Sequence, residues 1–102
     1  MPFVALEKLH LLFDGYRKPV NIGNRRYLII QEEGRVSLIR NACPHASAPL
    51  THASYADGYL RCPMHGIEFD LRSGRSRSPA CANSLEFLPL VYDGNQIGVE
   101  VN

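Results

Sequence analysis

The stretches CPHASAPL at residues 43–50 and CPMHGIEFD at residues 62–70 each place a histidine close behind a cysteine. Together they form the pattern C-x-H-x16-C-x2-H, which makes Cys43, His45, Cys62 and His65 candidate metal ligands. Two thiolates and two imidazoles can hold either a zinc ion or an iron–sulfur cluster with mixed ligands. Structural zinc sites more often place like ligands next to each other, so the alternating order favours the cluster.

Both stretches resemble the ligand loops of Rieske proteins. The first is close to the family form CPHxxAPL, and the second, followed by LRSG at 71–74, is close to CPxHGxxFDxxTG. The segment PAC at 79–81 also resembles a proline-containing loop that lies over the cluster in this family. The resemblance implies one [2Fe–2S] cluster per chain, with Cys43 and Cys62 on one iron and His45 and His65 on the other.

The residues around these ligands predict a low reduction potential. High-potential Rieske proteins carry an extra, disulfide-bonded cysteine in each loop, where this chain has Ala48 and Met64. They also carry a serine and a tyrosine that donate hydrogen bonds to the sulfur ligands, where this chain has Ile67 and Phe69. Fewer donors stabilise the reduced cluster less, so we expect a potential of about −150 mV rather than +300 mV.

Composition predicts a single small domain over residues 1–102. A net charge of +1 gives no reason to expect binding to nucleic acid or to a membrane surface. No apolar run approaches the roughly 20 residues of a membrane span, and no export signal is recognisable. Two of the three cysteines are candidate ligands, which leaves Cys81 without a disulfide partner. This cysteine usage predicts a cytoplasmic protein.

Short runs of β-branched and aromatic residues between turn signals predict an all-β domain. The resemblance implies the Rieske fold, in which an antiparallel β-sandwich or barrel base (1–40 and 84–102) carries an inserted, loop-rich cluster-binding lobe (41–83). Turns are expected at EEG (32–34) and DGN (93–95), and a short helical turn within 6–13. Strands are expected at 19–22, 27–31, 36–40, 59–61, 67–70, 85–92 and 96–101.

The remaining polar residues predict no second site. His10 and His52 are expected on the surface, and they lie 42 positions apart without the carboxylate that a mononuclear iron site would need. Met64 is expected at the exposed edge of the cluster site. The stripe of Arg72, Arg75 and Arg77 is either a solvated turn or a docking patch for an acidic redox partner.

Catalysis by this chain alone is therefore not expected. The resemblance implies a soluble one-electron carrier, the ferredoxin component of a multicomponent aromatic-ring dioxygenase system. It would bind transiently to a flavin-dependent reductase as electron donor and to a terminal oxygenase as acceptor. Two alternatives stay open: a small Rieske subunit of a larger redox enzyme such as assimilatory nitrite reductase, and a structural zinc domain.

Overall fold

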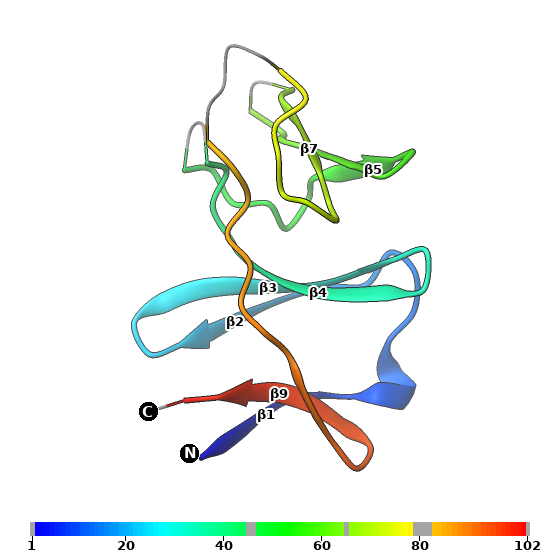
Figure 1. The fold of residues 1–102 in the computed structure, drawn as a ribbon, viewed down its shortest axis with the longest axis vertical. Helices are drawn as coiled ribbons and strands as arrows, with labels where there is room; N and C mark the ends of the chain where they lie inside the picture. Colours follow the sequence, from blue (N-terminus) through cyan, green and yellow to red (C-terminus); the bar gives the residue numbers. More distant parts are fainter. Residues whose placement is uncertain (1, 45–46, 65, 79–82, 102) are drawn as a thin grey trace.

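The computed structural model describes residues 2–44, 47–64, 66–78 and 83–101. Within these ranges the chain forms three antiparallel three-stranded sheets, with the strand orders β1-β9-β8, β2-β3-β4 and β5-β6-β7. Figure 1 shows the sheets stacked along the long axis of the molecule, with both termini at the end opposite β5 and β7. The elements are β1 (Phe3–Lys8), a 3-10 helix η1 (Leu9–Leu11), β2 (Arg17–Ile22), β3 (Arg25–Glu32), β4 (Arg35–Arg40), β5 (Ser54–Ala56), β6 (Tyr59–Arg61), β7 (Glu68–Asp70), β8 (Val91–Asp93) and β9 (Gln96–Glu100).

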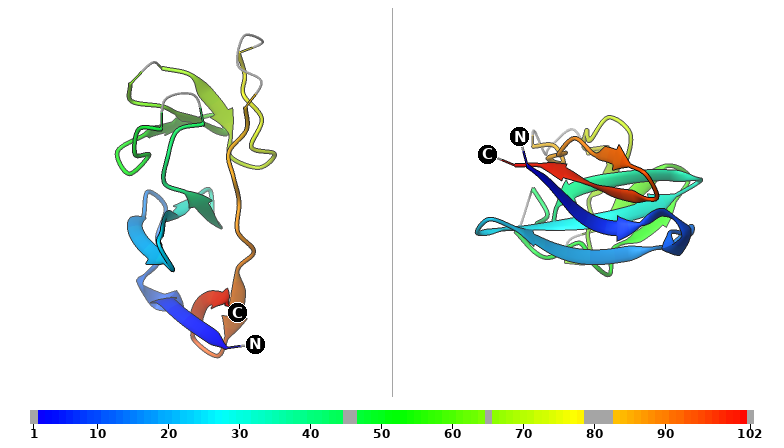
Figure 2. Two further views of the ribbon diagram at one scale, coloured as in Figure 1. Left: turned by 90° about the vertical axis from the view of Figure 1, so that its left-hand side faces the viewer. Right: turned by 90° about the horizontal axis from the view of Figure 1, so that it is seen from below.

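The antiparallel, all-β architecture confirms the predicted fold class. In the described part of the chain, no helix has the length and apolar sequence that crossing a bilayer requires. The molecule measures 41 × 27 × 20 Å along its principal axes, which reflects the stacking of sheets in one direction. Figure 2 shows the segment that leads from the β5-β6-β7 end to β8 running along the side of this stack.

The middle sheet is buried on both faces, and β3 shows this most clearly. Leu28 and Ile30 are fully buried in the apolar cluster that includes the side chains of the β5-β6-β7 end. Tyr27 and Ile29 point the other way, into the cluster shared with the β1-β9-β8 sheet. Four successive buried residues are typical of a strand covered on both sides. Burial of each large aliphatic side chain contributes about 1.5–3 kcal/mol.

The turn between β3 and β4 confirms the prediction made from EEG at 32–34. Glu33 and Gly34 form its two central positions, with φ angles of 51° and 74°. Positive φ at both positions is the geometry of a type I′ turn, whose twist matches that of the flanking strands. This turn fixes the register in which Glu32 pairs with Arg35 and Leu28 pairs with Ile39.

Two predicted elements are shorter in the structure, and two observed strands were not predicted. The expected strand at 85–92 is limited to β8, because residues 86–88 make only a short contact with β4 and Pro89 has no N–H to extend it. The expected helical turn within 6–13 is limited to η1, and residues 6–8 belong to β1. Neither β1 nor β5 was expected from the sequence. The alternation of β1 is interrupted by a register shift between Ala5 and Glu7, which weakens its period-2 pattern.

Gly98 allows β1 and β9 to approach each other at this irregularity. A Cβ atom built on Gly98 would lie 2.0 Å from the carbonyl oxygen of Val4, a contact that the backbone cannot accept without moving. We expect Gly98→Ala to lower the free energy of unfolding by about 3 kcal/mol. Gly94→Ala in the same hairpin meets no neighbouring atom and should cost only about 1 kcal/mol, for its positive φ. Chemical denaturation of both variants checks this, and equal losses would contradict it.

Candidate metal centre

The first cysteine loop begins three residues after β4. The N–H of Cys43 donates a hydrogen bond to the carbonyl oxygen of Ala48 at 2.6 Å. The carbonyl oxygen of Cys43 accepts one from the N–H of Ser47 at 2.7 Å. Ser47 has a φ of 57°, in the left-handed region that non-glycine residues rarely adopt. The backbone thus folds back on Cys43 within five residues.

The second cysteine loop repeats this geometry. Cys62 follows β6 directly, and its N–H donates to the carbonyl oxygen of Ile67 at 2.9 Å. Its carbonyl oxygen accepts from the N–H of Gly66 at 2.9 Å, and Gly66 has a φ of 70°. In both loops the N–H of the cysteine donates to the carbonyl oxygen of the residue five positions later. The carbonyl oxygen of the cysteine accepts from the N–H of the residue four positions later. The sequence showed the paired motifs but not that Ser47 and Gly66 are equivalent positions.

Gly66 is the better suited of the two residues at that position. Glycine adopts positive φ at little steric cost, whereas Ser47 is strained by about 1 kcal/mol. Gly66 also lies under the side chain of Arg61, since a Cβ atom there would be 2.8 Å from the arginine Nη2. The second loop therefore uses glycine both for its turn and for this close contact.

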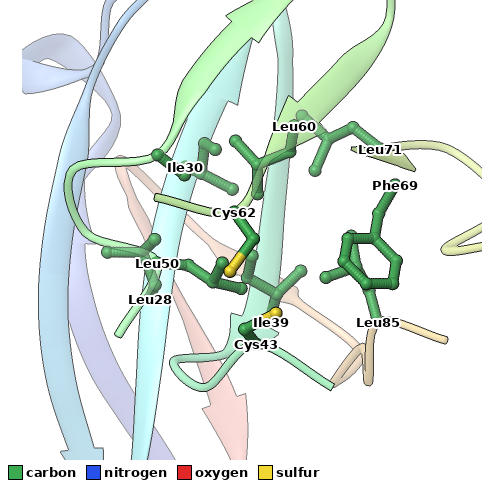
Figure 3. Packing of buried hydrophobic residues seen from close by; sticks show 11 residues of the cluster. Leu28, Ile30, Ile39, Cys43, Leu50, Leu60, Cys62, Phe69, Leu71 and Leu85 are labelled. Carbon is green, nitrogen blue, oxygen red and sulfur yellow. The ribbon is translucent and has the colours of Figure 1, made fainter. Parts of the chain in front are cut away.

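The two cysteines lie in one apolar cluster although they are 19 positions apart in the sequence. Each has a relative exposure of 1%. Figure 3 shows both side chains among those of the cluster, between residues of the middle sheet and residues of the β5-β6-β7 end. The other fully buried or nearly buried members are Leu28, Ile30, Ile39, Leu50, Ala53, Leu60, Phe69, Leu71 and Leu85.

This environment fits sulfur ligands of a metal centre. Every other member of the cluster is apolar, so a thiolate there requires a nearby positive charge, which a bound metal supplies. His45 and His65 lie outside the described residues, as do Pro79 and Cys81. The structure therefore places two of the four predicted ligands, and the full set of four remains a prediction.

Each cysteine also borders a hollow on the molecular surface. One of about 330 Å³ is lined by Cys43, Pro44 and the segment at 83–84. Another of about 380 Å³ is lined by Cys62, Met64 and His52, among others. A group bound between the two loops would thus lie close to solvent.

Three residues that the sequence analysis placed on the surface are exposed in the structure. Met64 is 65% exposed, and His10 and His52 are also exposed, as expected. His52 lies beside the second cysteine loop, not only near the first. Phe69 is fully buried in the cysteine cluster and Ile67 packs against it, so neither position offers a side-chain donor to sulfur.

The arginine stripe has mixed surroundings. Arg77 forms an ion pair with Glu68 at 3.2 Å and lies over the ring of Tyr59, at 4.4 Å from the centroid. Arg72 follows Asp70, whose carboxylate accepts hydrogen bonds from the N–H groups of Arg72 and Ser73. These bonds hold the pKa of Asp70 below its ordinary value. The three arginines are exposed, but Arg77 is engaged within the fold.

Asn41 holds the two ends of the first cysteine loop together, a role that the sequence did not reveal. Its Oδ1 accepts a hydrogen bond from the N–H of Leu50 at 2.7 Å, and its Nδ2 donates to Oγ1 of Thr51 at 3.0 Å. Its own N–H donates to the carbonyl oxygen of Arg26 in β3 at 3.0 Å. The one signal in the sequence that could have suggested this clamp is a hydrogen-bonding amide, Asn41, between the predicted strand at 36–40 and the candidate ligand Cys43.

We expect Asn41→Ala to lower the free energy of unfolding by about 1–3 kcal/mol, because it leaves the buried N–H of Leu50 without its acceptor. Thr51→Ala removes only the second contact of the amide and should cost less. Urea denaturation of the two variants measures the difference. A loss on Asn41→Ala no larger than that on Thr51→Ala would show that the bond to Leu50 is unimportant.

Comparison with known proteins agrees with the geometry of the two loops. The model of the Rieske [2Fe–2S] domain family matches residues 2–89. The ferredoxin component of an alkene monooxygenase system from Xanthobacter autotrophicus is 30% identical over 87 residues, which cover 84% of this chain and 70% of that protein. Several other curated relatives are much longer, and the chain spans only 10–18% of their length.

Solved structures extend the likeness over nearly the whole fold. The ferredoxin of carbazole 1,9a-dioxygenase from Nocardioides aromaticivorans superposes with a TM-score of 0.82 at 25% identity, covering 97% of both chains. A structure described as a nitrite reductase NADPH small subunit superposes with a TM-score of 0.78 at 19% identity, covering 99% of this chain and all of that one (100%). At that identity the second likeness shows the fold alone. The family match, the ferredoxin relatives and the paired cysteine loops show that this chain belongs to the Rieske [2Fe–2S] domain family.

Proposed function

We propose that this chain is a ferredoxin that carries one electron at a time from a flavin-dependent reductase to a terminal oxygenase in the cytoplasm. The observation that carries the proposal is the meeting of Cys43 and Cys62 in one buried cluster, each at the edge of a surface hollow. Buried sulfur ligands hold a redox centre in place, and nearby solvent-facing loops bring it within reach of another protein. The names of the ferredoxin relatives support an oxygenase system as the setting.

The proposed ligands are Cys43 and Cys62 on one iron and His45 and His65 on the other, for one cluster in the lobe at 41–83. When bound, the [2Fe–2S] cluster supplies a one-electron redox centre. The chain contributes the two cysteine loops, whose backbone geometry is fixed by hydrogen bonds at both Cys43 and Cys62. Pro63 and Met64 are exposed beside the second of them and offer a small contact surface. A small interface suits a complex that must dissociate after each electron.

The small subunit of a nitrite reductase has the same fold, so the fold does not separate the two functions. The presence of all four candidate ligands and the identity to a ferredoxin component favour the carrier. Purification separates the alternatives, because a subunit would remain bound to a large redox enzyme whereas a carrier would be obtained alone.

Low-temperature EPR of the dithionite-reduced protein, with iron and zinc analysis, tests the ligand set. We expect a rhombic signal typical of mixed histidine and cysteine ligation, with about two irons per chain. Cys43→Ser and Cys62→Ser should each abolish the signal and destabilise the fold, since cluster binding contributes to folding. Cys81→Ser is the matched control and should keep it. Colourless protein containing about one zinc per chain would instead establish a structural zinc domain.

The side chains at 67 and 69 predict the reduction potential. Because Ile67 and Phe69 donate no hydrogen bond, we expect a midpoint of about −150 mV, at the low end of the Rieske range. Phe69→Tyr adds a hydroxyl within the cysteine cluster and should raise the midpoint by tens of millivolts. Phe13→Tyr, on the exposed surface, should leave it unchanged. A wild-type midpoint above roughly +100 mV in a redox titration would show the prediction to be wrong.

A further inference from the structure

A groove of about 260 Å³ lies between β4 and the turn that follows β7. Leu38, Leu71 and Leu88 are among its lining residues, as are the aromatic residues Phe87 and Tyr92. Both aromatics are exposed, Tyr92 by 60%. The groove shares no lining residue with the two hollows beside the cysteines, so it is a separate surface.

One wall of the groove is an open strand edge. β4 is the last strand of its sheet, and residues 86–88 cover only part of its outer side. There the N–H of Arg40 donates to the carbonyl oxygen of Glu86 at 2.8 Å, and the carbonyl oxygen of Leu38 accepts from the N–H of Leu88 at 2.9 Å. The backbone N–H and C=O groups of every second residue in a strand point toward the same side of the strand. Val36 has the same parity as Leu38 and Arg40, so its N–H and C=O also point away from β3. Neither makes a backbone hydrogen bond with another described residue.

The register of β3 agrees with this orientation. Gln31 lies opposite Val36, and its N–H and C=O bond to Tyr16 and Gly15, away from β4. Gln31 and Val36 are therefore a non-hydrogen-bonded pair, and the backbone of Val36 is left facing the groove. Unpaired edges of this kind accept an added strand.

The groove presents guanidinium groups on its own lining. Arg35 and Arg72 line it, and no described lining residue is acidic. Neither guanidinium makes an ion pair or hydrogen bond with another described residue, although both lie near Asp70 and contribute slightly to its lowered pKa. Three carboxylates lie near these arginines without lining the groove: Glu32, Glu33 and Asp70. Glu32 pairs with Arg17 at 2.7 Å, whereas the neutral donors of Glu33 and Asp70 leave both of these carboxylates charged. What Arg35 and Arg72 offer a ligand is therefore guanidinium N–H donors that no described residue accepts from, rather than an excess of positive charge.

The two faces of the open edge differ in chemistry. The side chains of Val36 and Leu38 belong to the apolar cluster on the β1-β9-β8 side. Arg35 alternates with them and shares its face with Ile39, which packs on the β5-β6-β7 side. A strand added beside β4 would therefore meet guanidinium groups on one face and aliphatic side chains on the other.

We propose that this groove binds an extended segment of a partner protein in which acidic and apolar residues alternate, added as a strand to the edge of β4. Backbone hydrogen bonds to Val36 supply affinity, and Arg35 and Arg72 select the acidic side chains. A second copy of this chain fits less well, because symmetric pairing of two β4 edges would bring the same arginines together. That the partner is the electron donor or the electron acceptor rests on the proposed function. A segment bound in this groove would hold that partner without covering the cysteine loops.

To test this, the capped peptide Glu-Val-Glu-Val-Glu is titrated into the oxidised holoprotein. Two-dimensional NMR of the protein follows the backbone amide signals. We expect the amide of Val36 to shift on titration and the amides next to Cys62 to stay in place. Arg35→Gln combined with Arg72→Gln should weaken binding about tenfold. Arg25→Gln combined with Arg26→Gln, exposed on β3, removes the same charge elsewhere and should leave binding unchanged. Because the peptide has no redox group, this result is independent of electron transfer.

Val36→Pro removes the outward N–H and should abolish binding, as proline is tolerated at strand edges. If that variant does not fold, the same peptide with methylated backbone nitrogens gives the same test on the unchanged protein and should not bind. Equal weakening by both arginine pairs, or undiminished binding of the methylated peptide, would overturn the proposal. So would a wild-type dimer in sedimentation velocity that Val36→Pro converts to a monomer, since a second copy would then be the occupant.

Discussion

Burial of β3 on both faces holds the two apolar clusters of the described chain together. Leu28 and Ile30 pack against the β5-β6-β7 end, whereas Tyr27 and Ile29 pack against the β1-β9-β8 sheet. One strand therefore contributes side chains to two apolar clusters. A shift of its register by one residue would turn the side chains of each set toward the other cluster. The type I′ turn at Glu33 and Gly34 prevents this, because it fixes the pairing with β4.

The cysteine loops take their position from this middle layer. Cys43 follows β4 by three residues, and Asn41 bonds to both β3 and the far end of the same loop. Cys62 follows β6, whose Leu60 packs in the cluster that contains Leu28 and Ile30. The two loops then adopt one backbone geometry although their ligand spacings differ. Proteins commonly place functional residues on loops that a rigid scaffold of strands holds in position.

The surface separates into regions of different chemistry. Beside Cys62 lie the exposed Pro63 and Met64, which offer a small, largely apolar contact surface. Beside the edge of β4 lie the guanidinium groups of Arg35 and Arg72 and the outward N–H and C=O of Val36, which suit the extended segment proposed above. Under the proposed function, separate surfaces would let one partner be recognised away from the cysteine loops, so that the two contacts would not compete.

The family and most strands of the middle sheet could be predicted from the sequence, because the spacing of cysteine and histidine, the turn residues and the β-branched runs are all local patterns. The sequence also predicted β6 with the bounds that the structure has. It did not predict β1, whose pairing partner is β9 near the other end of the chain. Only the tertiary structure showed the clamp at Asn41 and the meeting of Arg35 with Arg72, residues 37 positions apart. Such features arise where segments that are distant in the sequence pack together, and a local sequence pattern does not predict which segments will meet.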